Sequence, residues 1–301
     1  LRSLVGSEMC IRDSNLSAAE KATLIANLAP FTVASITPVI VDPQTTRLIL
    51  NVSFKFDSSK TTETQSALIA KVNSDLQSYN TSTLTKFESA FRHSKITGII
   101  DDADPAITSN ITTVTLAKFI TPNLTSSTSY TLNFNNRFFH PHDGHNADAG
   151  GIIASTGFFI NDGSTEYFFD DDGQGNLRVY SLVSGVRTYL DSRAGTVDYV
   201  NGIIKINSIL ITSLSNVDGR ASTQFRITVL PDSNDIIPVR NQLLEIDTVN
   251  TTVVGTVDQT ATTGKGYTVT TTGGAGSTTG TATTTTTTVS TTSSTATSSS
   301  Y

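Results

Sequence analysis

Apolar residues at every second position of residues 46–56 constrain the fold of this chain more than any other feature. The alternating residues are Leu48, Leu50, Val52, Phe54 and Phe56, and the positions between them carry Ile49, Asn51, Ser53 and Lys55. Successive side chains of a strand point to opposite faces, so this period of two predicts a half-buried strand. Residues 42–110, which contain the strand, therefore describe a scaffold rather than an active site.

The apolar period changes from two to three and four directly after this strand. Thr62 and Gln65 have the spacing of a capping box, in which two side chains satisfy the N–H groups at the start of a helix. The apolar stripe that follows consists of Leu68, Ile69, Val72, Leu76 and Tyr79. We therefore expect a helix that ends at Asn80.

A second apolar stripe, formed by Leu84, Phe87 and Phe91, predicts another helix before the charged residues 92–95. His93 would then lie near the end of that helix. Turn-forming residues follow, and residues 111–120 return to a strand-like pattern. The expected local order is strand, helix, helix, strand.

The spaced positions of this segment resemble the baseplate wedge subunits of contractile-tailed phages of the T-even type, in the baseplate-J-like group. The shared pattern is VDPxxxxLxLxVxFxxD…YNxxxLxxFxxxFRxSKIxxxIDxxDPxIxSN, and the later stretches FxxDDGxGNLRVY, GTVDYxxG and VLPDSNDIIPVRNQLLEID extend it over roughly residues 15–250. The resemblance implies a structural virion protein that forms a homodimer and joins other wedge proteins in a ring around the tail hub. It also implies a location in the tail baseplate, with assembly in the host cytoplasm.

The composition argues against two classes of partner. The chain has 301 residues, of which 15% are charged, and its formal net charge is −6. Binding to a phosphate backbone depends on clustered Lys and Arg, so we expect no nucleic-acid partner. No apolar run approaches the roughly 18 to 20 residues that cross a bilayer, so we expect no membrane span. We expect no cofactor and no small-molecule substrate either.

Both ends differ in composition from the middle of the chain. Residues 1–14 contain the only Cys and the only Met, and they resemble an artefactual leader of translated contigs. We expect a non-native leader before the carboxy-terminal half of a longer subunit, with a genuine amino-terminal peptide as the alternative. Without Cys10 the chain has no thiol, which excludes disulfides and cysteine chemistry.

Residues 258–301 consist almost entirely of Thr, Ser, Gly and Ala. They contain too few apolar residues to offset the entropy lost on ordering, so we expect a disordered tail. A Thr-rich β-stalk or a glycosylated linker is the alternative.

We expect an α+β fold with two domains between these ends. Ser17 and Glu20 form a further capping box, so a helix over residues 18–28 should precede a strand over residues 35–41. Together with the strand, two helices and strand described above, these elements predict an α/β sandwich domain over residues 15–124.

Residues 125–257 should form an antiparallel, β-sandwich-like domain. Apolar and polar residues alternate over residues 130–135 and again over residues 224–229, as in strands with one buried face. Asn201 and Gly202 favour a tight hairpin turn, because both residue types tolerate a positive φ. The paired residues Phe138–Phe139, Phe158–Phe159 and Phe168–Phe169 should each place one ring on either face of a sheet.

Three of the four histidines lie within residues 140–145, and imidazole is a favoured ligand of zinc, iron and nickel. The sequence is similar to the HxHxDH pattern of metallo-β-lactamase-type hydrolases, but Gly144 stands where that pattern has its Asp. We favour an exposed Pro/Gly loop without a metal, so His140, His142 and His145 are only weak candidates. A structural metal and a catalytic metal are the alternatives.

Residues 170–176, DDDGQGN, have the carboxylates of a calcium loop. On the EF-hand pattern the twelfth position falls on Ser181, which cannot act as the bidentate acid. The flanking sequences predict strands rather than helices, so we favour a polar hairpin turn.

Other signals of catalysis are weak. The chain has no GxSxG motif, and Ser94 beside His93 says nothing about side-chain geometry. Asp101, Asp102 and Asp104 are typical of a surface turn. We therefore expect a non-enzymatic structural protein without catalytic or cofactor-binding residues. A β-rich adhesin or tail-fibre-like binding module is the alternative, and a metal-dependent hydrolase is a third hypothesis.

Overall fold

The computed structural model describes residues 17–31, 40, 43–145, 151–217, 221–239 and 241–259. The predicted strand over 35–41, the leader and the tail beyond 259 lie wholly or almost wholly outside these residues. The chain divides into two compact units that are discontinuous in sequence. Of the described residues, unit 1 contains those within 17–49, 79–92 and 114–247, and unit 2 contains those within 50–78, 93–113 and 248–259.

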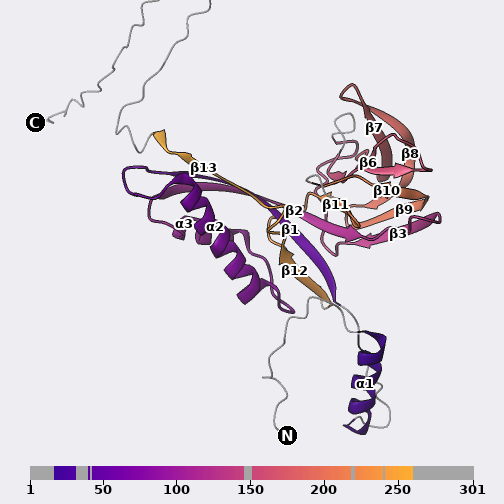
Figure 1. Ribbon diagram of the computed structural model, residues 1–301, viewed down its shortest axis with the longest axis horizontal. Coiled ribbons are helices and arrows are strands. Elements are labelled where there is room, and N and C mark those ends of the chain that lie inside the picture. Colours follow the sequence, from indigo (N-terminus) through magenta and orange to yellow (C-terminus); the bar gives the residue numbers. More distant parts are fainter. Residues whose placement is uncertain are drawn as a thin grey trace, which may run out of the picture. The chain divides into compact units, whose positions relative to one another are not determined.

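The described elements combine helices with many strands, so the expected α+β class is confirmed (Figure 1). The helical elements are α1 (Ala18–Leu28), a 3₁₀ turn (Ala29–Phe31), α2 (Gln65–Tyr79), a π-helical turn (Asn80–Leu84) and α3 (His93–Asp102). The strands are β1 (Gln44–Phe56), β2 (Ile107–Ile120), β3 (Thr128–Asn133), β4 (Ile153–Ser155), β5 (Phe158–Ile160), β6 (Tyr167–Asp171), β7 (Asn176–Val183), β8 (Val186–Asp198), β9 (Ile203–Ile209), β10 (Ile211–Leu214), β11 (Phe225–Val229), β12 (Gln242–Ile246) and β13 (Thr252–Val257).

The predicted helix over residues 18–28 is confirmed as α1, and its capping box is formed. Glu20 N–H donates to Ser17 Oγ at 3.3 Å, while Ser17 N–H donates to the Glu20 carboxylate at 2.9 Å. Pro30 has no N–H to continue the helix, and the chain passes into the 3₁₀ turn.

Unit 2 contains the second part of β1, the first part of β2, and α2, α3 and β13. The period-two prediction is confirmed, because Val52, Phe54 and Phe56 of β1 are buried. The apolar stripes of both helices are buried as well, with 0% exposure for Leu68, Val72, Leu76, Ile96 and Ile100. Helix α2 begins later than expected, since Ala67 N–H donates to Thr64 Oγ1 and not to Thr62.

The second helix lies at His93–Asp102, and the prediction of a helix through Leu84, Phe87 and Phe91 is wrong. Phe91 is completely buried but forms a β-bridge with Ile236, whereas Phe87 is 47% exposed. Phe91 is therefore held by backbone pairing with Ile236, far away in the sequence, and not by a helix. His93 begins α3 instead of ending a helix, and its Nε2 lies 2.8 Å from Thr112 O.

The antiparallel part of unit 1 is a seven-stranded sheet in the order β10-β5-β6-β7-β8-β9-β3. All its strand pairs are antiparallel, as the sequence predicts for this region. Phe158 and Phe169 stack at 4.8 Å between ring centres, and Phe225 of β11 packs against both rings. Each of the three Phe-Phe pairs has one buried ring and one more exposed ring, as expected.

The hairpin at Asn201-Gly202 exists, but its turn is longer than the predicted two residues. Asp198 pairs with Ile203, so four residues connect β8 to β9. Gly202 alone among these four has a positive φ, of 66°. The Asp198 carboxylate accepts N–H bonds from Val200 and Asn201, which stabilises the wider turn.

Two strands near the end of the described chain pair in parallel with β1. Residues 242–246 of β12 pair with residues 44–48 within unit 1, and residues 252–257 of β13 pair with residues 51–56 within unit 2. The sequence predicts two consecutive domains, 15–124 and 125–257. The two units instead alternate along the sequence, because β12 and β13, near the end of the described chain, pair with β1 near its beginning.

Lys118 is a partly buried cation in β2. Its Nζ lies 5.9 Å from the centre of the Phe134 ring, and no ion pair involving Lys118 is found among the described residues. Burial lowers the pKa of the Lys118 ammonium from 10.5 to about 8. The folded protein therefore holds this proton less tightly than the unfolded chain does.

We expect Lys118→Met to raise the unfolding free energy by about 1 to 2 kcal/mol near neutral pH, because an apolar side chain carries no desolvation cost. Between a pH of about 8 and 10.5 the unfolded chain binds more protons than the folded protein, so wild-type stability should rise across this window. Denaturant unfolding of both proteins at neutral and alkaline pH tests this. If the difference in unfolding free energy between the two proteins did not become smaller at alkaline pH, the lowered pKa of Lys118 would be contradicted.

Candidate functional site

The acidic turn, residues 170–176, connects β6 to β7 as a polar hairpin, in agreement with the favoured interpretation. Asp170 and Asp171 are the last residues of β6, and Asn176 begins β7. Gly173 and Gly175 have φ values of 71° and 93°, which side chains with a Cβ rarely adopt. The three aspartates therefore point in directions set by a strand end and a tight turn.

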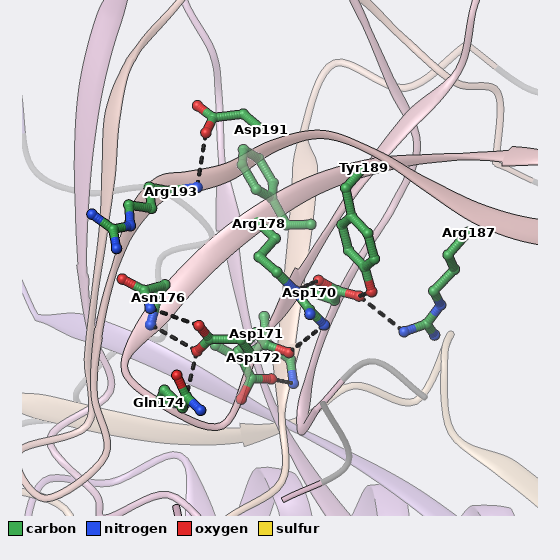
Figure 2. Close-up of polar contacts among 12 residues, drawn as sticks. Asp170, Asp171, Asp172, Gln174, Asn176, Arg178, Arg187, Tyr189, Asp191 and Arg193 are labelled. Atoms are coloured by element: carbon green, nitrogen blue, oxygen red, sulfur yellow. Dashed lines mark hydrogen bonds and ion pairs between the residues drawn. The ribbon is translucent and has the colours of Figure 1, made fainter. Parts of the chain in front are cut away.

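Asp170 lies at the centre of a buried ionic cluster (Figure 2). Its side chain is 1% exposed, and its two oxygens accept bonds from Arg178 Nε at 2.9 Å and Arg187 Nη1 at 2.9 Å. Tyr189 OH donates to the same carboxylate at 3.1 Å. Burial raises the pKa of the Asp170 carboxyl, and the two guanidinium groups oppose this shift.

Aromatic rings cover the two arginines of this cluster. The Arg178 guanidinium lies 4.3 Å from the centre of the Tyr189 ring, and the Arg187 guanidinium lies 4.7 Å from that of Tyr180. These cation–π contacts join β7 to β8 on the face that carries Asp170. The cluster therefore connects β6, β7 and β8 through side-chain contacts.

Asp171 is completely buried and binds protein donors on several sides. Its oxygens accept from Ile152 N–H at 2.6 Å, Ile153 N–H at 2.9 Å and Tyr199 OH at 2.7 Å. Burial, and then the charge and hydrogen bond of Asp171, raise the pKa of the Tyr199 phenol. A Cβ on Gly151 would lie 2.1 Å from Asp171 Oδ1, so only glycine fits there. Asp171 thus anchors the start of β4 to the acidic turn.

Asp172 closes the turn itself. It accepts N–H bonds from Gln174 and Asn176, and the Asn176 side chain donates to it at 2.6 Å (Figure 2). Burial tends to raise the pKa of the Asp172 carboxyl, but these hydrogen bonds lower it overall. All three carboxylates accept hydrogen bonds from donors of the protein itself, and these bonds stabilise the hairpin.

The histidine loop, residues 140–145, packs against the acidic turn. His140 Nε2 lies 3.1 Å from Gly173 O, and the His140 ring stacks on Tyr199 at 4.3 Å. A Cβ on Gly173 would lie 2.6 Å from His145 O, which shows how closely the two backbones approach. The loop is therefore less exposed than the sequence suggests.

The three candidate histidines have different surroundings. His145 is 2% exposed, with its Nδ1 3.0 Å from His142 O, and its buried Nε2 has no hydrogen-bond partner among the described residues. His142 is exposed, and its Nδ1 lies 3.1 Å from Asp143 O. Within the described parts of the chain, no group of three or more His, Cys, Asp or Glu residues is arranged to hold a metal ion.

We expect His142→Ala to change the unfolding free energy by less than about 0.5 kcal/mol, because an exposed side chain loses few contacts. His145→Ala should cost more, since it removes a buried ring that packs edge-on against His140 and Tyr199. Denaturant unfolding with and without added zinc compares the two variants. A large loss at His142 that zinc reverses would show that this loop holds a metal.

The acidic residues at the end of α3 and in the turn after it do not form a common site. Asp104 accepts from Lys71 Nζ at 2.8 Å and from Ala106 N–H, while Asp101 accepts from the Asn110 side chain. The hydrogen bond from Lys71 Nζ and the one from Ala106 N–H lower the pKa of the Asp104 carboxyl. These contacts hold the turn into β2, as turn chemistry predicts.

Sequence reasoning missed an exposed apolar arm, defined here as residues 182–190 at the joined ends of β7 and β8. Leu182, Val183, Val186 and Leu190 are 52%, 57%, 67% and 59% exposed. Ser184 and Gly185 form its turn, with φ values of 52° and 81°. The signal available in the sequence was the apolar residues on both sides of Ser-Gly. Exposed apolar residues gathered in this way mark interaction surfaces.

Comparison with known protein families confirms the resemblance to baseplate wedge subunits. Residues 47–118 match the family described as baseplate structural protein gp6, C-terminal domain III. The matched range begins in β1, contains α2 and α3, and ends in β2. No curated protein matches the chain. Among the described residues, no helix is long and apolar enough to cross a membrane.

Proposed function

We propose that the chain is the carboxy-terminal part of a baseplate wedge subunit, and that it acts through contacts with other subunits of a contractile tail. The observation that carries this proposal is the family match over residues 47–118, because these residues form one continuous strand, helix, helix and strand. The matched family is one of structural phage baseplate proteins. We propose further that the subunit makes the contacts that build and hold the baseplate ring.

The arrangement of the acidic turn supports a structural role over a catalytic one. Asp170, Asp171 and Asp172 are each bound by donors of the same protein, so their carboxylates serve the hairpin and its neighbours. Catalytic carboxylates need to reach a substrate or a reacting water. We therefore assign no catalytic residue, and we propose that the partners are a second copy of the chain and other wedge proteins.

The location of the protein in the phage particle tests this proposal. Antibodies against the chain should label the baseplate end of intact tails, and mass spectrometry should find the protein in purified baseplates. A stop codon in its gene should leave lysates without complete baseplates, and a plasmid copy should restore them. Label confined to fibre tips, with complete baseplates in the mutant, would support the adhesin alternative instead.

A further inference from the structure

The turn from Tyr199 to Gly202, which connects β8 to β9, holds a buried segment in place. Gly202 O accepts a hydrogen bond from Phe134 N–H at 2.8 Å, and Tyr199 O accepts one from Phe138 N–H at 2.8 Å. The side chains of Phe134 and Phe138 are completely buried, and their rings pack edge to face with 5.3 Å between their centres. Two carbonyl groups of the turn therefore fix a segment of the core.

Gly202 has no room for a side chain. Its φ is 66°, and a Cβ at this position would lie 2.0 Å from Asn136 O, so the close approach of the two backbones requires glycine. Among the described residues, Gly202 N–H donates no hydrogen bond. The backbone nitrogen that follows Asn201 therefore has no Cβ beside it and no acceptor to hold it.

The exposed side chain of Asn201 is held by Asp198. Asn201 Nδ2 donates to Asp198 Oδ2 at 2.7 Å, and Asn201 N–H donates to Asp198 Oδ1 at 2.9 Å. These bonds, the side-chain bond most, lower the pKa of the Asp198 carboxyl, so the group is ionised at neutral pH. A hydrogen bond to an ionised acceptor is stronger than one between neutral groups, so Asp198 restricts rotation of the Asn201 amide.

We infer that Asn201 is a site of spontaneous deamidation, and that the Asp198 carboxylate restrains this reaction in the folded protein. The Gly202 nitrogen attacks Cγ of the Asn201 side chain, and its proton passes through solvent to the amide nitrogen, which leaves as ammonia. Water then opens the resulting succinimide at either of its carbonyl carbons and leaves an aspartate or an isoaspartate at this position. Because the reacting groups belong to adjacent residues, the reaction needs only water as a co-reactant.

Either product weakens the turn. An aspartate places a second carboxylate within hydrogen-bond distance of Asp198, where like charges repel each other. An isoaspartate adds a methylene to the backbone, which displaces Gly202 from the Asn136 backbone that it closely contacts. The Gly202 carbonyl then moves away from Phe134 N–H, and a buried N–H without an acceptor is unfavourable. Deamidation of this turn therefore loosens the buried segment that it holds.

Peptide mapping of the full chain measures the reaction. Trypsin releases residues 194–205 as a peptide in which Asn201 is the only amide side chain, so a change from amide to acid is assigned to this residue. The chain unfolded in guanidinium chloride should convert at Asn201 at least about tenfold faster than the folded chain, because the bond to Asp198 is then absent. Asn207, which precedes a serine, is the internal control and should convert more slowly than Asn201 in the unfolded chain. Equal rates at Asn201 in the folded and unfolded chain, or no conversion in either, would overturn the inference.

Asp198→Ala tests the restraint. In the folded chain we expect it to speed conversion at Asn201 by about tenfold or more, because no carboxylate then holds the amide. Phe91→Ala is the control for lost stability, since it removes a buried ring whose residue pairs with Ile236 and not with the turn. While still folded, it should convert at close to the wild-type rate. If Phe91→Ala reacts as fast as Asp198→Ala, general unfolding controls the reaction and the restraint assigned to Asp198 is wrong.

Asn201→Asp supplies one product of the reaction directly. We expect this variant to unfold at a lower denaturant concentration than the wild type, because two carboxylates then face each other. Asp198→Asn combined with Asn201→Asp should recover much of the loss, since an amide again faces a carboxylate. If Asn201→Asp were as stable as the wild type, the product would not weaken the turn and this part of the inference would fail.

Discussion

Phe91→Ala should lower the unfolding free energy by about 3 to 5 kcal/mol, the usual cost of removing a fully buried aromatic ring. The Phe91 side chain is 0% exposed, and its backbone exchanges hydrogen bonds with Ile236 at 2.9 and 3.0 Å. Alanine keeps these backbone bonds but leaves a cavity under them. Urea unfolding followed by circular dichroism measures the loss directly.

Phe87→Ala is the matched control for this prediction. The two phenylalanines belong to the same apolar stripe in the sequence, but Phe87 is 47% exposed. We expect its replacement to cost less than about 1 kcal/mol, because much of the ring already contacts water. Equal losses at the two positions would mean that the stripe is buried as one helical face, and the described fold of this segment would be wrong.

The contrast between these residues shows where sequence reasoning succeeds in this chain and where it fails. The alternation in β1 and the stripe of α2 are local patterns, and both are buried as predicted. Capping at Ser17 and Glu20 is local too, and it sets the start of α1. The position of Phe91 depends on Ile236, about 145 residues away, and no local period contains that information.

The same limit explains the interleaved units. Residues 242–246 and 252–257 have ordinary strand patterns, but nothing in them states that they pair in parallel with β1. Local turn chemistry was more informative at Asp172 and Asp198, where the side chains bind the backbone a few residues on. The predicted two-residue turn at Asn201-Gly202 is too short, because the Asp198 carboxylate stabilises a four-residue connection.

The candidate sites show a related division. The sequence places three carboxylates together in the acidic turn, but the arginines that bind Asp170 come from β7 and β8, and only the fold brings them to one face. Burial of His145 likewise depends on its contact with Tyr199, more than fifty positions away. The apolar residues on both sides of Ser184-Gly185 predict a hairpin, but the sequence does not tell that they are exposed, because an apolar strand has the same pattern whether or not a neighbour covers it.

Asp170→Ala should be as costly as the loss of Phe91, at about 3 to 5 kcal/mol, for an electrostatic reason. The substitution leaves the guanidinium groups of Arg178 and Arg187 facing a site that no longer carries a negative charge, and Arg178 is only 8% exposed. Two buried or partly buried cations then repel each other without compensation. Chemical denaturation measures the loss, and Asp143→Ala is the control, since that carboxylate is 93% exposed and should matter little.

A double-mutant cycle separates this ionic cost from the loss of packing. If the penalty comes from an uncompensated cation, Asp170→Ala combined with Arg178→Met should be clearly less costly than the sum of the two single losses, by about 1 to 3 kcal/mol. Independent losses that simply add would contradict the cluster.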